Sequence, residues 1–121
     1  MGSGNARQMP AWCLHNDACP LSVYHVAEAF GVSVRTCNRR LAAAGIGTLA
    51  DVVGFSRTLR AALRLERDET PLSLIAGEMG FPDAHALRMQ LKRRLGLTPT
   101  QCRAGEVRLT VMKSLPRLAA R

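Results

Sequence analysis

The chain has 121 residues and a formal net charge of +8, from 17 basic and 9 acidic side chains. This length allows one compact domain, or two very small units that share a helix, and excludes two domains of ordinary size. No apolar run reaches the roughly 18 residues of a membrane-spanning helix, and the N-terminus lacks the basic-then-apolar order of a secretory signal. We therefore expect a soluble, cytoplasmic protein.

Residues 1–20 mix Gly, Ser, Asn and Pro with isolated apolar residues and show no period. We expect a leader or linker that is disordered in part, with Trp12 and Leu14 able to hold it on the core. A minor alternative is a metal or redox sensor built from Cys13, His15 and Cys19. Cys-x-His-x3-Cys is not a recurrent zinc spacing, so we predict reduced thiols and no cofactor.

The segment VAEAFGVSVR, which begins at Val26, returns in weaker form 49 positions later as IAGEMGF, which begins at Ile75. Each copy consists of an apolar helical stretch, a glycine turn and the start of a second helix. This order is typical of a helix-turn-helix, so the chain is predicted to contain two of them.

In the first copy, Ser22 is a suitable N-cap for a helix that ends at Phe30. Gly31 supplies the positive φ that a tight turn requires, and Ser33 caps a second helix that runs to about Ala44. The sequence therefore predicts two short helices that meet at a sharp angle.

A long helix is predicted between the copies, capped by Thr48 and running over residues 49–67. The face opposite the apolar stripe carries the arginines Arg57, Arg60, Arg64 and Arg67. We expect this face to contact solvent, or else RNA polymerase. Gly54 near the middle predicts a kink or a close helix contact.

In the second copy, Thr70 is the predicted cap and Pro71 the start of the first turn of a helix that runs through Met79. Gly80 repeats the role of Gly31, and Asp83 is the predicted cap of a basic helix over 84–95. Thr98-Pro99 opens a short helix through Cys102. Residues 107–112 fit a helix or a strand, within a basic C-terminal tail over 106–121.

Positive charge is segregated along the chain. Neither residues 31–45 nor residues 84–105 contain an acidic side chain, although both contain several basic ones. Apart from Lys92 and Lys113, the basic residues are arginines, whose forked guanidinium suits phosphate and guanine edges. An acidic polymer is therefore the expected partner.

The residues resemble the DNA-binding domain of the AraC/XylS family of bacterial transcription regulators over roughly 21–105. The residues that carry the resemblance are Gly31-Val32-Ser33, Arg39-Arg40-Leu41, Met79-Gly80-Phe81, Leu91-Lys92-Arg93-Arg94, Gly96 and Thr98-Pro99 with Arg103. It implies an all-α, homeodomain-like fold in which two helix-turn-helix lobes, joined by the long helix, enter successive major grooves of double-stranded DNA. An isolated domain of this kind is expected to be monomeric.

Helical spacing places Arg35, Asn38 and Arg39 on one exposed face of the first recognition helix. The resemblance implies that these residues and Thr36 read bases or fix phosphates. The second helix departs from the family pattern at Ala84, His85 and Met89. There we expect Arg88, Lys92, Arg93 and Arg94 mainly to hold phosphate. The predicted DNA-binding residues are Arg35, Thr36, Asn38, Arg39, His85, Arg88, Met89, Lys92 and Arg93.

Two further classes of function follow from the same residues. A helix-turn-helix domain that has lost DNA reading and binds polymerase or another regulator is the alternative, because the second lobe departs from the family pattern. An enzyme is not predicted, since the sequence has no Ser/His/Asp arrangement, paired carboxylates, phosphate-cradling glycine loop or HExxH-type site.

Overall fold

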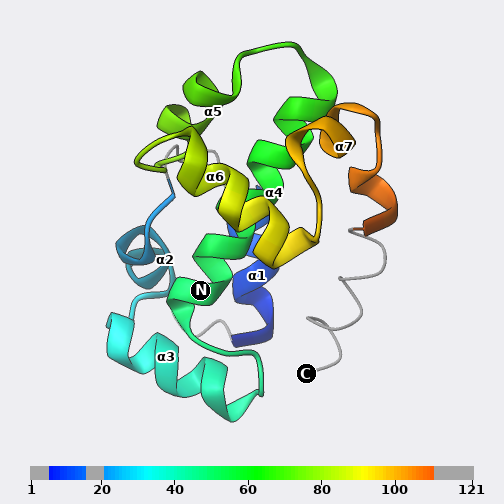
Figure 1. Cartoon of the computed structure of the whole chain (residues 1–121). Helices are drawn as coiled ribbons and strands as arrows, with labels where there is room; N and C mark the ends of the chain where they lie inside the picture. The colour runs from blue at the N-terminus through cyan, green and yellow to red at the C-terminus, as the bar shows by residue number, and fades with distance from the viewer. Residues whose placement is uncertain (1–5, 16–20, 111–121) are drawn as a thin grey trace.

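The computed structural model describes residues 6–15 and 21–110, and this part of the chain is helical, as predicted (Figure 1). The elements are η1 (Ala6–Gln8), α1 (Met9–His15), α2 (Val23–Phe30), α3 (Val34–Ala43), α4 (Leu49–Arg67), α5 (Leu72–Glu78), α6 (Ala84–Gln90), η2 (Leu91–Leu95) and α7 (Pro99–Arg103). η1 is a 3-10 turn, and η2 continues α6 as a π-helix. No helix in this part combines the length and apolarity needed to cross a membrane.

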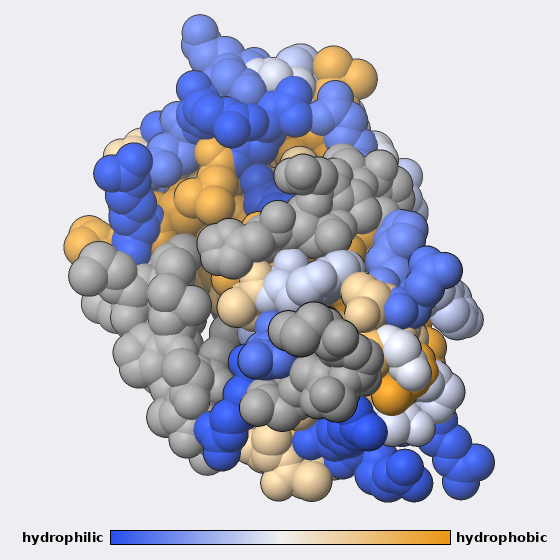
Figure 2. All heavy atoms as spheres, turned by 180° about the vertical axis from the view of Figure 1, so that it is seen from behind, coloured by the Kyte–Doolittle hydropathy of each residue, from blue (hydrophilic) through white to orange (hydrophobic). Residues whose placement is uncertain are grey.

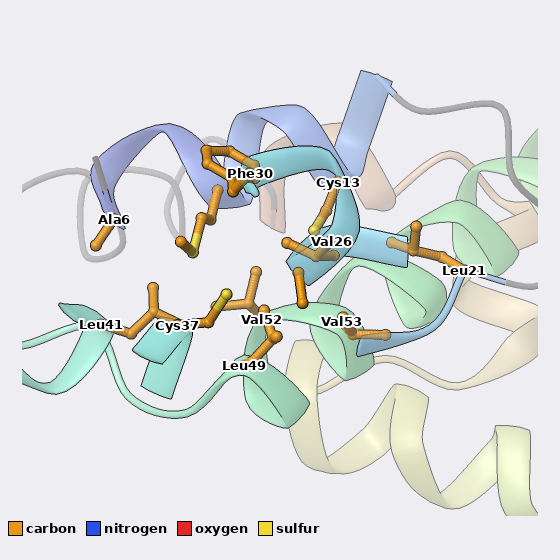
Figure 3. Close-up of a cluster of buried hydrophobic side chains, with 12 residues drawn as sticks. Ala6, Cys13, Leu21, Val26, Phe30, Cys37, Leu41, Leu49, Val52 and Val53 are labelled. Carbon is orange, nitrogen blue, oxygen red and sulfur yellow. The ribbon is translucent and has the colours of Figure 1, made fainter. Parts of the chain in front are cut away.

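Helix α4 runs through the middle of the molecule, with α2 and α3 near one end and α5 and α7 near the other (Figure 1). The buried side chains form two clusters along it. The first core cluster lies among η1, α1, α2, α3 and the start of α4, and includes Val26, Phe30, Cys37 and Leu41 (Figure 3). The second lies among the rest of α4, α5, α6, η2 and α7, and includes Leu59, Ile75 and Leu87.

The helix starts follow local side-chain chemistry. Four predicted N-caps are confirmed, at Ser22, Ser33, Thr48 and Asp83. In each, the side chain accepts a hydrogen bond from the backbone N–H three residues later. The prediction was wrong at Thr70, because α5 begins one residue later, after Pro71. The Thr70 N–H instead donates to Asp68 Oδ1 at 3.0 Å, so Asp68 organises this turn.

The segment interpreted as a leader contributes a helix to the first core cluster. Met9 and Cys13 of α1 are fully buried. Trp12 packs edge-on against Phe30 with ring centroids 6.0 Å apart, and Leu14 packs against the second cluster, so both hold the segment on the core as expected. A seven-residue helix with Pro10 inside it has little stability of its own, so tertiary burial rather than sequence propensity stabilises α1.

The C-terminal segment also begins inside the fold. Residues 107–110 are helical, which settles part of the choice between helix and strand, and Val107 is fully buried in the second core cluster. Residues 111–121 lie outside the described part of the chain. Side chains before residue 21 and after residue 105 thus take part in the two core clusters. We therefore infer that the structural unit extends beyond the predicted domain over 21–105.

The arginines on α4 differ from the predicted solvent-facing stripe. Arg57 Nε donates to the Leu21 carbonyl at 2.7 Å, and Arg60 Nη2 donates to the Cys13 carbonyl at 2.8 Å. Arg64 forms ion pairs with Asp68 and Glu78. Apart from Asp68, which caps the end of α4 four residues after Arg64, these acceptors lie on other segments, so helical periodicity along α4 cannot reveal them. Of the four arginines, Arg67 is exposed as predicted.

Candidate nucleic-acid interface

The repeated sequence folds into the same turn twice. The two turn glycines have positive φ angles of 69° at Gly31 and 89° at Gly80, which favour glycine over residues with a Cβ. The residue after each glycine donates its backbone N–H to a carbonyl of the preceding helix, at 3.2 Å for Val32 to Ala27 and 2.8 Å for Phe81 to Ala76. These donors and acceptors are related by the 49-residue offset of the repeat. The same backbone hydrogen bond therefore closes the turn that precedes each second helix.

Helix α3 presents arginine to solvent from a well-anchored backbone. Cys37 and Leu41 are fully buried and fix the inner face, as the apolar spacing predicted. Arg35 and Arg39 are exposed one helical turn apart, with Arg40 beside them. Seen from behind, hydrophilic side chains lie along the lower edge of the molecule, at the end where α3 lies, together with paler and apolar ones (Figure 2). The exposed pair can present two guanidinium forks to one groove.

Two of the other predicted DNA-binding residues are partly committed to the fold. Thr36 Oγ1 accepts a 3.0 Å hydrogen bond from the Ser33 hydroxyl at the start of α3. Asn38 is half-buried, and its Oδ1 accepts a 2.7 Å bond from the backbone N–H of Leu49, the first residue of α4. A forked contact with adenine needs that oxygen as an acceptor. Asn38 is therefore first of all a brace between α3 and α4.

Helix α6 and its continuation η2 carry the second basic face. All five residues predicted there are exposed, namely His85, Arg88, Met89, Lys92 and Arg93. Leu87 and Leu91 are fully buried on the opposite side. Met89 is 55% exposed, so this face offers a large apolar side chain among cations. Such a side chain can contact a thymine methyl group but cannot bind phosphate.

The brace formed by Asn38 has no counterpart in the second copy. The second turn has one additional residue, so the offset becomes 50 after it, and Arg88 corresponds to Asn38. The residue that corresponds to Leu49, the first of α4, is Pro99, the first residue of α7. Proline has no backbone N–H, so it cannot donate the equivalent hydrogen bond. Arg88 is exposed, and the same position is therefore structural in one copy and available to a ligand in the other.

The end of the second recognition helix is one residue longer than the end of the first. Gly45, the terminal glycine, comes four positions after Leu41, whereas Gly96 comes five positions after Leu91. The π-helical turn η2 accommodates the additional residue. Both glycines have positive φ angles, at 73° and 70°, so the two helices still end in the same way.

Arg94 does not lie with the phosphate-binding candidates. Its Nε donates to Gln90 Oε1 at 2.6 Å, and its Nη1 donates to the Asp51 carbonyl of α4 at 3.3 Å. Burial lowers the pKa of this guanidinium, although the nearby Asp51 carboxylate offsets part of the effect. The side chain lies against Gly54, where a Cβ would come within 2.5 Å of Arg94 Nη2. The close contact predicted at Gly54 is confirmed, and its partner is Arg94.

Of the Cys/His cluster considered from sequence, the structure describes Cys13, and no group of three potential metal ligands is found among the described residues. Cys13 is fully buried, and burial raises the pKa of its thiol to about 11. A protonated, enclosed thiol is a poor ligand, because metals bind the thiolate. Cys19 lies outside the described residues.

Two helix-glycine turn-helix units, each with a cationic second helix, define a helix-turn-helix DNA-binding protein. A family described as a helix-turn-helix domain matches residues 26–105. The chain belongs to this family, the AraC-type helix-turn-helix domain of DNA-binding transcription regulators. Comparisons with curated proteins and with solved structures found no match.

Proposed function

We propose that this regulator binds double-stranded DNA at a defined sequence, with α3 and α6 in successive major grooves on one face of the duplex. The observation that supports this most strongly is the repeated turn, because the same backbone hydrogen bond closes each glycine turn and a helix with exposed basic residues follows each. Helix α4 has 19 residues, so it is about 28 Å long at ~1.5 Å per residue. This length is comparable with the roughly 34 Å helical turn of B-DNA.

The exposed residues have different tasks in this proposal. Arg35 and Arg39 read base edges from α3, while Asn38 holds that helix against α4. On α6, Arg88 is the candidate base reader. Lys92 and Arg93 follow on η2 and hold phosphate, as predicted from sequence.

The isolated domain is expected to act as a monomer on an asymmetric site, because its two recognition helices present different side chains. RNA polymerase stays a second candidate partner. Neither the oligomeric state nor this partner is needed for the DNA-binding proposal.

Selection of bound sites from a random duplex library tests the proposal. One asymmetric motif with two blocks about a helical turn apart is expected, and one block alone would limit base reading to a single helix. Affinity for the selected site should fall steeply with salt, with a log-log slope of about −0.9 per phosphate contacted. Failure to bind any duplex at low salt would reject DNA reading and favour the protein-interaction module.

A further inference from the structure

The start of α4 is attached to both recognition helices. The N–H of Leu49 donates to Asn38 of α3, and the carbonyl of Asp51 accepts from Arg94 at the end of the second recognition helix. Asp51 is held in turn by Thr48, whose backbone N–H donates to Asp51 Oδ2 at 3.2 Å. One short stretch of backbone is therefore the common attachment point of the two DNA-reading elements.

Direct packing between the two helix-turn-helix units is interrupted beside this point. A cavity of about 460 Å³ opens between the start of α2, the first half of α4 and α6, and its lining includes Tyr24, Gly54, Pro82, Gln90 and Arg94. Side chains across an open cavity cannot fix the separation of α2 and α6 by close packing. The relative position of the units then depends on α4, on the bonds that cross to it, and on α1, whose Leu14 packs against the second core cluster.

Arg94 is well suited to hold α4 and the second recognition helix in a fixed relative position. Its guanidinium bonds neutral oxygens on Gln90 and Asp51, and its planar end fits against Gly54 because that residue has no side chain. A planar fork with several donors can fix an angle in a way that a flexible ammonium cannot. A contact with phosphate, by contrast, would use the charge of Arg94 and need neither Gly54 nor Asp51.

We infer that Arg94 and Gly54 form a positioning joint that sets the distance and angle between α3 and α6, and thereby the spacing between two base blocks that this protein accepts. The inference rests on the proposed two-groove binding. Adding or removing one base pair turns the second block by about a tenth of a helical turn, so a rigid joint makes the protein sensitive to spacing.

Binding to duplexes that carry the selected motif with its native spacer, or with one base pair more or fewer, tests this joint. We expect the wild type to lose roughly tenfold in affinity when the spacer changes, the size of one mismatched contact. Arg94→Ala and Arg94→Lys should both reduce this ratio to about threefold or less while leaving the salt slope unchanged. Arg94→Lys is informative because it retains the charge.

Gly54→Ala supplies an independent variant. Its Cβ would displace only the flexible end of Arg94, and alanine favours the helix, so its melting temperature should not fall. Its spacer ratio should nevertheless fall as it does for Arg94→Ala. Arg93→Ala is the matched control, since Arg93 is exposed next to Arg94. It should weaken binding to all three duplexes equally and reduce the salt slope.

The outcomes separate the two proposals. A selected motif with a single base block would overturn two-groove binding, and the joint with it, whereas a two-block motif that the wild type binds without spacer preference would overturn the joint alone. A wild-type preference that persists in Arg94→Ala and Gly54→Ala would overturn the joint alone. A smaller salt slope for Arg94→Ala, with full affinity retained in Arg94→Lys, would identify Arg94 as a phosphate contact instead.

Discussion

The backbone N–H of Leu49 and the side-chain oxygen of Asn38 lie 2.7 Å apart, and this hydrogen bond joins the first recognition helix to the long central helix. Asn38, a predicted DNA-binding residue, therefore has a structural role. The corresponding Arg88 is exposed, and the residue that corresponds to Leu49 is Pro99, which has no N–H to donate.

Asn38→Ala removes the acceptor for the Leu49 N–H. We expect the free energy of unfolding to fall by about 1 kcal/mol, as for the loss of a typical hydrogen bond. Asn38→Asp keeps an acceptor, and its negative charge lies near the N-terminus of α4, so it should be close to wild type. Urea denaturation compares the three proteins. Equal losses in both variants would contradict the brace.

Arg57→Ala should lower the free energy of unfolding by about 1 kcal/mol, because it removes the bond to the Leu21 carbonyl from a half-buried guanidinium. Arg67→Ala on the same helix is the control. Arg67 is exposed, so a change within about 0.5 kcal/mol is expected. The two midpoints in urea should therefore differ, and coincident midpoints would show that the α4 arginines behave as a solvated stripe.

Stability should decrease in acid through Asp68. Hydrogen bonds from Thr70 and the ion pair with Arg64 lower the pKa of Asp68 to about 2 in the folded state. The pKa of an aspartate in an unfolded chain is about 3.9. Between about pH 2 and about pH 4 the unfolded chain therefore binds more protons than the folded protein. The contribution of Asp68 is thus present above about pH 4 and is lost as the pH falls toward about 2.

Asp68→Asn should weaken this dependence of urea stability on pH. Asp51 also has a lowered pKa, chiefly through hydrogen bonds from Thr48, so part of the dependence will remain in the variant. The wild type and Asp68→Asn are therefore compared over the same acid range. Parallel curves for the two proteins would rule out Asp68 as a source of the acid sensitivity.

Arg39→Ala and Lys92→Ala should affect DNA binding differently. If Arg39 reads a base, its removal should cost about 1–3 kcal/mol on the preferred site and less on random duplex. If Lys92 contacts phosphate, Lys92→Ala should lower the affinity for both duplexes equally. It should also reduce the salt slope by the amount that corresponds to about one phosphate contact. Fluorescence anisotropy on both duplexes at several salt concentrations measures this. Equal losses from Arg39→Ala on the two duplexes would show that it does not read bases.

The features that could be predicted best are those that depend on residues close together in the sequence. Ser33, Thr48 and Asp83 cap helices because their side chains reach an N–H three residues away, and such pairs are visible in the chain. The apolar period likewise placed Cys37 and Leu41 in the core.

Long-range contacts could not be predicted in this way. The acceptor of Arg60 lies 47 residues earlier, at Cys13, in a segment without a helical pattern. Helical spacing groups Asn38 with the exposed Arg35 and Arg39, but Asn38 is half-buried, and the period gives no information about what its oxygen bonds. Arg94 was grouped with its basic neighbours because charge is visible in a sequence, whereas the space beside Gly54 is not.

The internal bonds of the arginines change what the composition of this chain means. Arg57, Arg60, Arg64 and Arg94 bond to carbonyls, carboxylates and an amide of the protein, and Arg103 donates to the carbonyls of Asp68 and Thr70. Their charge contributes to the isoelectric point, yet their donors already join one helix or turn to another. An arginine-rich chain of this kind uses one residue type both to build its frame and to meet a polyanion, so its overall basicity overstates the number of cations free to displace counterions.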